Sequence, residues 1–314
     1  KGTMKTAFVF PGQGSQYVGM GKDLWENFDE VKALYNEASE ALGYDVKGLS
    51  FNGPLEELNK TFRTQPCLLT ASIAAYKVLS SHGLTPHVMA GHSLGEYSAI
   101  VAAGVIPFKE AVVLTEKRGM FMQEAVPEGK GLMAAIIGLD RQKVDDICLS
   151  VESGYVSPAN YNSPGQIVIA GEKNAVEDAM KLAKIAGAKR ALALTVSAPS
   201  HCTLMVEASN RLAELLNTIK IKDPEVPIVN NADAVMLTTA DRIKASLIKQ
   251  LNSPLLWEDS VRNIVETGVD TIIEVGPGKV LTGLIKRIEP SVKLFNVEDT
   301  ASLKKTLEEL KAIG

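Results

Sequence analysis

The chain has few cysteines, few histidines and little net charge, and it contains no long apolar run. Its three cysteines, Cys67, Cys148 and Cys202, are far apart and odd in number, so they form neither a disulfide framework nor a zinc-ligand spacing. A formal net charge of −4 argues against a general nucleic-acid-binding protein, which is normally basic. No run approaches the roughly 18 apolar residues that a membrane-spanning helix needs. Because 46% of the residues are hydrophobic and 22% are charged, we expect a soluble globular protein. The cysteine pattern predicts the reducing cytoplasm as its compartment.

The length of 314 residues predicts two domains, or one large domain with an insertion, and no internal repeat is found. We expect Lys1 to Thr3, ahead of Met4, to be an addition to the natural chain, and no signal-peptide pattern follows Met4.

Strand-like and helix-like patterns alternate along 1–127 and 198–314, which predicts one large α/β domain with a mostly parallel sheet. Its strands are expected at Thr6–Pro11, just before Gly91, and at Pro227–Asn230, Thr271–Val275 and Val292–Asn296. Its helices are expected at Asp23–Leu42, Leu55–Leu58, Gln65–His82, Pro107–Glu124, Leu204–Ile219, Asp241–Leu251, Trp257–Thr267, Val280–Arg287 and Ala301–Ala312.

Residues 128–197 carry a different order of elements, strand-helix-strand-strand-helix-strand, in about seventy residues. This β-α-β-β-α-β order is that of a ferredoxin-like unit, so we predict a small domain inserted into the larger one. The expected elements are Gly131–Ile137, Asp140–Ser150, Tyr155–Tyr161, Gln166–Ala170, Glu172–Ala186 and Lys189–Val196.

The sequence Gly91-His92-Ser93-Leu94-Gly95 lies between a short apolar run and an alanine-rich helical pattern. A G-x-S-x-G motif between a strand and a helix is typical of a nucleophile turn, in which the glycines leave room for a strained serine. The following helix would direct its N–H groups and positive end towards an oxyanion at that serine. We therefore predict that Ser93 is a catalytic nucleophile; the alternative is an ordinary turn serine.

A serine hydroxyl needs a base to take its proton, and the chain has four histidines. His82 and His87 precede the serine strand, and His92 should point away from Ser93 because neighbours in a sharp turn diverge. Elimination leaves His201 as the base, with a surface histidine as the alternative.

A hydrolase triad places an acidic residue between the serine and the histidine in chain order. The candidates Asp140 and Asp145 fall within or at the edge of the predicted insertion. The sequence therefore favours a dyad whose histidine is oriented by a neutral group, such as a backbone carbonyl.

A glycine-containing turn, Gly12-Gln13-Gly14, follows the first predicted strand. It fails the dinucleotide-binding fingerprint because Tyr17 occupies the position of the third glycine. A loop at this end of a strand could lend a backbone N–H to an oxyanion hole. A tight turn without a chemical role is the alternative.

Arg118 lies within a predicted helix among largely apolar neighbours. Its planar guanidinium presents paired N–H donors that match the two oxygens of a carboxylate, which lysine cannot do. The functional hypothesis is a carboxylate clamp, and the alternative is a solvated surface arginine.

Taken together, the motifs resemble those of the malonyl-CoA:acyl carrier protein transacylase family of bacterial type II fatty acid synthesis. The resemblance spans essentially the whole chain after Met4, with the motifs in the family's order. It rests on Phe10-Pro-Gly-Gln-Gly-Ser15, Gly91-His-Ser-Leu-Gly-Glu96, Arg118, Asn160-x-Asn162, Ser200-His201-Cys202, Gln250-Leu-x-x-Pro254-x-x-Trp257 and Glu274-x-Gly-Pro-Gly278.

The resemblance implies an α/β-hydrolase-like core with a ferredoxin-like insertion and an active site between them. It implies that Ser93 attacks the thioester of malonyl-CoA, with His201 as base and then as acid. The main-chain carbonyl of Gln250 would hold the His201 ring, and the backbone N–H groups of Gln13 and Leu94 would form the oxyanion hole.

The resemblance also implies that Arg118 grips the malonyl carboxylate and that Met122, Asn160 and Asn162 lie at the substrate. The malonyl group would then pass to the phosphopantetheine thiol of an acidic acyl carrier protein, in a ping-pong cycle that supplies fatty acid synthesis. Malonyl-CoA enters as a substrate, so no permanently bound cofactor, no metal, no nucleic acid and no membrane partner are expected.

An acidic carrier protein is expected to meet a basic rim, for which Lys189-Arg190 and Lys286-Arg287 are candidates. Solvated surface charges are the alternative.

Two rival functions remain open from the sequence. One is a serine esterase or thioesterase that releases the acyl group to water, and the other is a non-catalytic module that docks a carrier protein.

Overall fold

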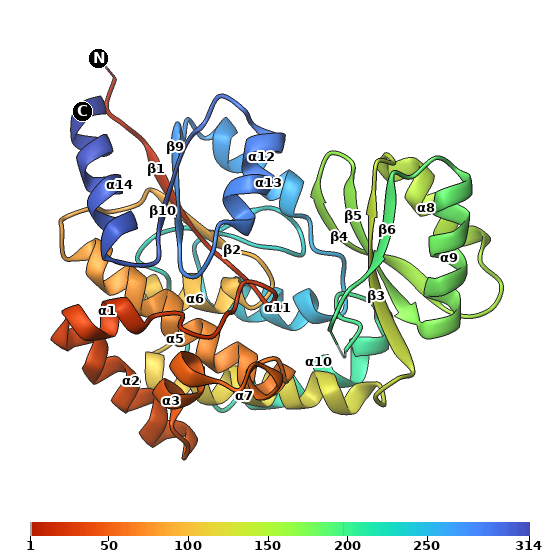
Figure 1. Cartoon of the computed structure of the whole chain (residues 1–314), viewed down its shortest axis with the longest axis horizontal. Helices are drawn as coiled ribbons and strands as arrows, with labels where there is room; N and C mark the ends of the chain where they lie inside the picture. The colour runs from red at the N-terminus through yellow and green to blue at the C-terminus, as the bar shows by residue number, and fades with distance from the viewer. Residues whose placement is uncertain (1, 197) are drawn as a thin grey trace.

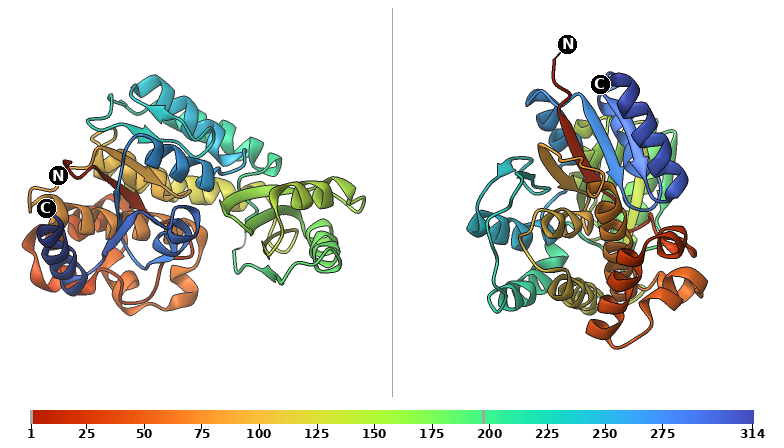
Figure 2. Two further views of the ribbon diagram at one scale, coloured as in Figure 1. Left: turned by 90° about the horizontal axis from the view of Figure 1, so that it is seen from above. Right: turned by 90° about the vertical axis from the view of Figure 1, so that its left-hand side faces the viewer.

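The computed structural model describes residues 2–196 and 198–314. It has a larger lobe built on one sheet and a smaller lobe built on a second sheet (Figures 1 and 2). Lys1, and Ser197 at the end of the predicted small domain, lie outside the described residues. No helix within the described ranges is both long enough and apolar enough to cross a membrane.

In the larger lobe, six strands of the described residues form one sheet in the order β10-β9-β1-β2-β7-β8. Neighbouring strands are parallel from β10 to β7, and β8 pairs antiparallel with β7. The strands are β1 (Thr6–Phe10), β2 (Val88–Gly91), β7 (Ile228–Val229), β8 (Met236–Leu237), β9 (Thr271–Val275) and β10 (Lys293–Val297).

Helices cover both faces of this sheet, because its strands carry apolar side chains on both faces, as the central strand β1 illustrates. Phe8 and Phe10 belong to the hydrophobic cluster on one face, whereas Ala7 and Val9 belong to the cluster on the other. Side chains alternate along a strand, so a continuous apolar run buries both faces, as parallel sheets require.

The helices of the larger lobe are α1 (Lys22–Asn27), α2 (Asp29–Leu42), α3 (Val46–Asn52), α4 (Leu55–Leu58), α5 (Thr61–Ser80), α6 (Gly95–Ala102), α7 (Phe108–Ala125), α10 (Val206–Leu216), α11 (Ala240–Leu251), α12 (Trp257–Glu266), α13 (Val280–Ile288) and α14 (Thr300–Ile313). A short 3-10 turn, η1 (Thr203–Met205), precedes α10.

The smaller lobe is an antiparallel sheet in the order β4-β5-β3-β6 with two helices. Its elements follow one another as β3 (Gly131–Ile137), α8 (Arg141–Ser150), β4 (Val156–Ser163), β5 (Gln166–Glu172), α9 (Lys173–Ile185) and β6 (Arg190–Ala193). Figure 1 shows α8 and α9 on the side of this sheet that faces away from the larger lobe. This is the ferredoxin-like order, so the predicted fold class is confirmed.

The two lobes meet where β4 runs beside the chain that leads into α12. The backbone N–H of Leu255 donates to the carbonyl of Ala159 at 2.7 Å, and Tyr161 donates back to Leu255 at 2.9 Å. Nearby, Arg141 of α8 forms ion pairs with Glu258 and Asp259 at the start of α12. The predicted domain boundaries at 127/128 and 197/198 stay a prediction.

Some predicted elements were wrong in detail. The helix expected over Asp23–Leu42 is divided at Phe28, whose extended backbone separates α1 from α2. The helix expected from Gln65 begins at Thr61. Neither α3 nor the short strand β8 was predicted. The α3 sequence has weak helical propensity, and its start depends on Asp45, whose side chain accepts from the N–H of Gly48.

Candidate active site

Ser93 lies in a sharp turn between β2 and α6, with a backbone φ of 54°. A Cβ atom at Gly91 would overlap the backbone of Gly95, and one at Gly95 would overlap the carbonyl of Phe10. A positive φ is strained for serine, and such strain is typical of functional sites. The geometry is that of a nucleophile turn.

His201 meets the Ser93 hydroxyl although 108 positions separate the two residues. The distance from Ser93 Oγ to His201 Nε2 is 2.8 Å, and His201 Nδ1 lies 2.9 Å from the main-chain oxygen of Gln250. A carbonyl oxygen can only accept, so Nδ1 carries the hydrogen and Nε2 is free to accept the serine proton. The structure thus brings the two residues of the predicted dyad, Ser93 and His201, together with the carbonyl of Gln250 that was predicted to orient the histidine.

Burial, and after it the positive charge of Arg118, lower the pKa of His201 to about 3. The imidazole is therefore neutral at physiological pH, the form that can act as a base.

The acidic candidates do not reach His201. Asp140 caps α8 by accepting from the N–H of Lys143 at 2.9 Å, and Asp145 accepts from the Tyr161 hydroxyl at 2.8 Å. Among the described residues, the Nδ1 partner of His201 is the neutral carbonyl of Gln250.

Arg118, on α7, is 1% exposed, which excludes a solvated surface role. Its Nη1 donates to Gln65 Oε1 at 2.9 Å, and its Nη2 donates to Gln250 Oε1 at 3.0 Å and to Ser93 Oγ at 3.4 Å. Its carbon Cζ lies 5.1 Å from the centre of the Tyr97 ring. Its Nε has no hydrogen-bond partner among the described residues. Burial lowers the pKa of Arg118, but an arginine remains charged.

Met122 is buried on the same helix as Arg118. Its Sδ lies 3.3 Å from Nε2 of Gln65, the residue whose Oε1 accepts from Arg118. Gln65 of α5 therefore connects the two predicted substrate-binding side chains, a link that sequence reasoning did not find.

The two predicted oxyanion-hole groups are the backbone N–H groups of Gln13 and Leu94. Among the described residues, neither the N–H of Gln13 nor that of Leu94 donates a hydrogen bond. The Gln13 side chain donates to Thr61 Oγ1 at 3.4 Å, which ties its loop to the start of α5. Leu94 directly precedes α6, so its N–H lies at the positive end of that helix.

Asn160 and Asn162 are both buried on β4. Asn162 Oδ1 lies 2.8 Å from Nε2 of His92, whose ring packs edge-on against Trp257. This contact joins the smaller lobe to the nucleophile turn. In the described part of the chain, Oδ1 of Asn160 is buried without a hydrogen-bond partner.

Two further polar residues, Glu96 and Asn231, lie beneath the nucleophile and were not predicted. Asn231 Oδ1 accepts from the Ser93 N–H at 2.9 Å, and its Nδ2 donates to the Gly91 carbonyl at 2.6 Å. Glu96 accepts from the backbone N–H of Asn231 and from Gln250 Nε2. The available signals were a glutamate in the otherwise apolar sequence of α6 and an asparagine at the carboxyl end of β7.

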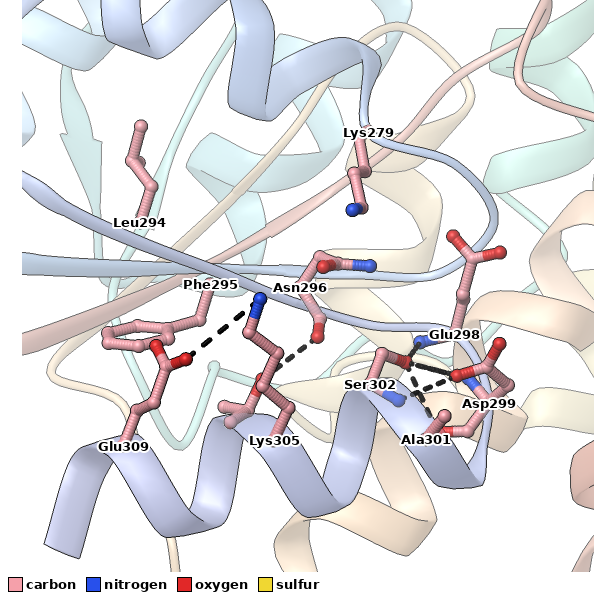
Figure 3. A pocket seen from close by; sticks show the side chains of 11 residues that line it. Lys279, Leu294, Phe295, Asn296, Glu298, Asp299, Ala301, Ser302, Lys305 and Glu309 are labelled. Carbon is pink, nitrogen blue, oxygen red and sulfur yellow. Dashed lines mark hydrogen bonds and ion pairs between the residues drawn. The ribbon is translucent and has the colours of Figure 1, made fainter.

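A separate cavity of about 410 Å³ lies between β10 and α14 (Figure 3). Its charges are largely paired, since Lys305 interacts with Glu309 and Asp299 caps α14. Residues Ser93 and His201 are not part of its lining, which consists of Lys279, Leu294, Phe295, Asn296, Glu298, Asp299, Ala301, Ser302, Lys305, Thr306 and Glu309.

Comparison with known proteins agrees with the geometry of the site. The model of the acyl transferase domain family matches residues 7–306. The malonyl CoA-acyl carrier protein transacylase of Escherichia coli strain K12 is 54% identical over 304 residues, 96% of this chain and 98% of the relative.

Two solved structures have nearly the same fold. An acyl carrier protein S-malonyltransferase from Vibrio cholerae is 53% identical, with a TM-score of 0.94 over 96% of this chain and 99% of that chain. A malonyl-transacylase in complex with a type II PKS acyl-carrier protein is 53% identical, with a TM-score of 0.95 over 97% and 99%. This chain therefore belongs to the acyl transferase domain family and, within it, to the malonyl-CoA:acyl carrier protein transacylases.

Proposed function

We propose that this chain transfers the malonyl group of malonyl-CoA to the phosphopantetheine thiol of an acyl carrier protein, supplying the extender unit for fatty acid synthesis. The observation that carries the proposal is the 2.8 Å contact between Ser93 Oγ and His201 Nε2, with the Arg118 guanidinium 3.4 Å from the same hydroxyl. A nucleophile beside a buried cation suits an acyl group that carries its own carboxylate.

In the first half-reaction, Ser93 Oγ attacks the thioester carbonyl carbon while His201 Nε2 takes the hydroxyl proton. The thioester C–S bond then breaks, and His201 gives the proton to the sulfur of coenzyme A. The product is malonyl-Ser93. Because Gln250 holds Nδ1, the same ring nitrogen serves as base and as acid.

In the second half-reaction, His201 takes the proton of the carrier's thiol, and the thiol sulfur attacks the carbonyl carbon of malonyl-Ser93. The ester C–O bond breaks and the proton returns to Ser93 Oγ. In both halves the N–H groups of Gln13 and Leu94 donate to the oxyanion, and the positive end of α6 adds to its stabilisation.

Arg118 gives the reaction its preference for malonyl. A carboxylate that leaves water needs a fixed counter-charge, which the guanidinium supplies. An acetyl group leaves the guanidinium unpaired. In this proposal Met122, Asn160 and Asn162 line the acyl position from α7 and β4.

Residues 1–127 and 198–314 form the catalytic domain, and 128–197 form the small domain that contacts the nucleophile turn through Asn162. All chemical groups of the cycle come from the chain, the thioester of malonyl-CoA and the thiol of the carrier protein, so we include no permanently bound cofactor. The three cysteines are unpaired and buried, which supports a reducing cytoplasm.

The test is to incubate the protein with malonyl-CoA, with and without a phosphopantetheinylated carrier protein, and to measure malonyl-carrier and free malonate by mass spectrometry. We expect malonyl-carrier to accumulate and little malonate to form in either arm. Malonate release without the carrier would favour a thioesterase. Carrier binding without any malonyl transfer would favour a docking module.

A further inference from the structure

Glu96 is a buried carboxylate that the proposed reaction does not use. It is 2% exposed and lies in the first turn of α6, three residues after Ser93. Desolvation of a carboxylate is costly, so a residue of this kind in a packed helix needs specific partners.

Both carboxylate oxygens of Glu96 accept hydrogen bonds from groups that hold the site. Oε1 accepts from the backbone N–H of Asn231 at 2.8 Å, and Oε2 accepts from Gln250 Nε2 at 3.1 Å. Asn231 in turn accepts from the Ser93 N–H. The carboxylate of Glu96 is thus linked to the nucleophile turn through Asn231.

The Gln250 side chain connects Glu96 to Arg118. Its Nε2 is surrounded by three acceptors, which are Glu96 Oε2, the Ser93 carbonyl at 2.9 Å and Asn231 Oδ1 at 3.2 Å. Its Oε1 consequently points to the other side, where it accepts from Arg118 Nη2 at 3.0 Å. The direction of this one amide determines whether Arg118 meets an acceptor or a donor.

We propose, on the basis of the proposed function, that Glu96 is a positioning residue. It fixes the Gln250 side-chain amide, and through it the Arg118 guanidinium, in the orientation that selects a carboxylated acyl group.

The hydrogen bonds from Asn231 and Gln250 require two acceptor atoms on the side chain at position 96. A glutamine there has one NH₂ group, which would face either the N–H of Asn231 or Nε2 of Gln250, and two donors repel each other. If the Gln250 amide turned over to relieve this, its Nε2 would face Arg118 Nη2 instead. A charged acceptor also makes the stronger hydrogen bond.

The charged groups around Glu96 also support its role as a positioning residue. Arg118 on α7 attracts the carboxylate of Glu96, and Asp233 in the turn after β7 repels it, although Asp233 is paired with Lys249 on α11. Burial has the largest effect and raises the pKa of Glu96 to about 7. Glu96 is therefore ionised at pH 8 and gains a proton as the pH falls through 7.

The test is the variant Glu96→Gln, measured by single-turnover acylation of Ser93 with malonyl-CoA and with acetyl-CoA. We expect the malonyl rate to fall about tenfold more than the acetyl rate, because a small displacement of Arg118 affects the carboxylated substrate. A residue with only a structural role would lower both rates equally, and that outcome would overturn the proposal. Two acylation rates that both stay at the wild-type values would overturn it as well.

The matched control is Glu274→Gln. Glu274 is also fully buried, with its pKa raised to about 7, but it holds the start of α13 through Leu281 and Thr282. We expect this variant to keep the wild-type malonyl-to-acetyl ratio. If the wild-type protein forms no malonyl-serine, the proposed function fails, and this outcome is distinct from failure of the Glu96 assignment.

A measurement on the wild-type protein covers the case in which Glu96→Gln does not fold. The malonyl-to-acetyl ratio of acylation rates is recorded from pH 8 to pH 6. We expect the ratio to fall, since a protonated Glu96 presents an O–H to one of its two donor partners. A ratio that stays constant over this range would contradict the proposal.

Discussion

Among the described residues, the hydrogen-bond partners of the buried Arg118 guanidinium are the neutral side chains of Gln65, Gln250 and Ser93. A buried cation held by neutral groups is stabilised when a carboxylate arrives. In the proposed function, the preference for a malonyl group follows from this guanidinium, whose direct hydrogen-bond partners are neutral while the Glu96 carboxylate attracts it without bonding to it.

We predict that Arg118→Ala lowers kcat/KM for malonyl-CoA about 100-fold, because hydrogen bonds to a charged group are worth about 1.5–3 kcal/mol. The value for acetyl-CoA should change much less, so that the preference for malonyl is lost. Steady-state kinetics with the two thioesters measures both effects in one preparation. Retained malonyl preference in this variant would remove Arg118 from the acyl site.

The sequence was sufficient to single out Ser93 and His201, whose side chains the structure places 2.8 Å apart, since a G-x-S-x-G turn is specific and the chain has four histidines. It was not sufficient to find Glu96 and Asn231, which are 135 positions apart and act through contacts that depend on the complete fold. The carbonyl of Gln250 was predicted through family resemblance, but the several contacts of its side chain were not.

At the scale of elements, the site is assembled at the carboxyl ends of parallel strands. β2 leads into the nucleophile turn, β7 ends just before Asn231, and β1 leads into the Gly12–Tyr17 loop. In open parallel sheets, ligands bind at this edge. Strand β9 ends in the same region, and its Glu274 accepts hydrogen bonds from Leu281 and Thr282 at the start of α13.

We predict that Glu274 makes stability depend on pH. Burial raises its pKa from 4.5 to about 7, so it stabilises the fold below pH 4.5 and loses this contribution as the pH rises through 7. At about 1.4 kcal/mol per unit, the free energy of unfolding of the wild type relative to Glu274→Gln should fall by about 3 kcal/mol over this range. Urea unfolding of both proteins at several pH values measures the difference. A difference independent of pH would contradict the prediction.

Long, periodic elements were predicted well, and short ones were not. The strands Gly131–Ile137 and Thr271–Val275 have their predicted bounds, because each is a mainly apolar run that ends directly before a glycine. β8 has two residues and exists only by pairing with β7, so no local pattern could indicate it. The division between α1 and α2 falls at Phe28, where the sequence has neither glycine nor proline to indicate it.

At the scale of the whole molecule, the fold brings distant segments to one point. Ser93 follows β2, His201 lies in the chain that returns from the smaller lobe, and Gln250 lies near the end of α11. The insertion between Ser93 and His201 does not interrupt the site; it contributes Asn162, which contacts His92 beside the nucleophile. The alternation of strands and helices was enough to predict this architecture, whereas the contacts between the lobes needed coordinates.

In the proposed cycle Ser93, activated by His201, carries the malonyl group. Intact-mass spectrometry after mixing with malonyl-CoA tests it directly in the wild type, Ser93→Ala and His201→Ala. We predict that the wild type gains the mass of one malonyl group and loses it to a carrier protein, that Ser93→Ala gains none, and that His201→Ala acquires it far more slowly. A malonyl adduct on Ser93→Ala that is passed on to the carrier protein would contradict the account.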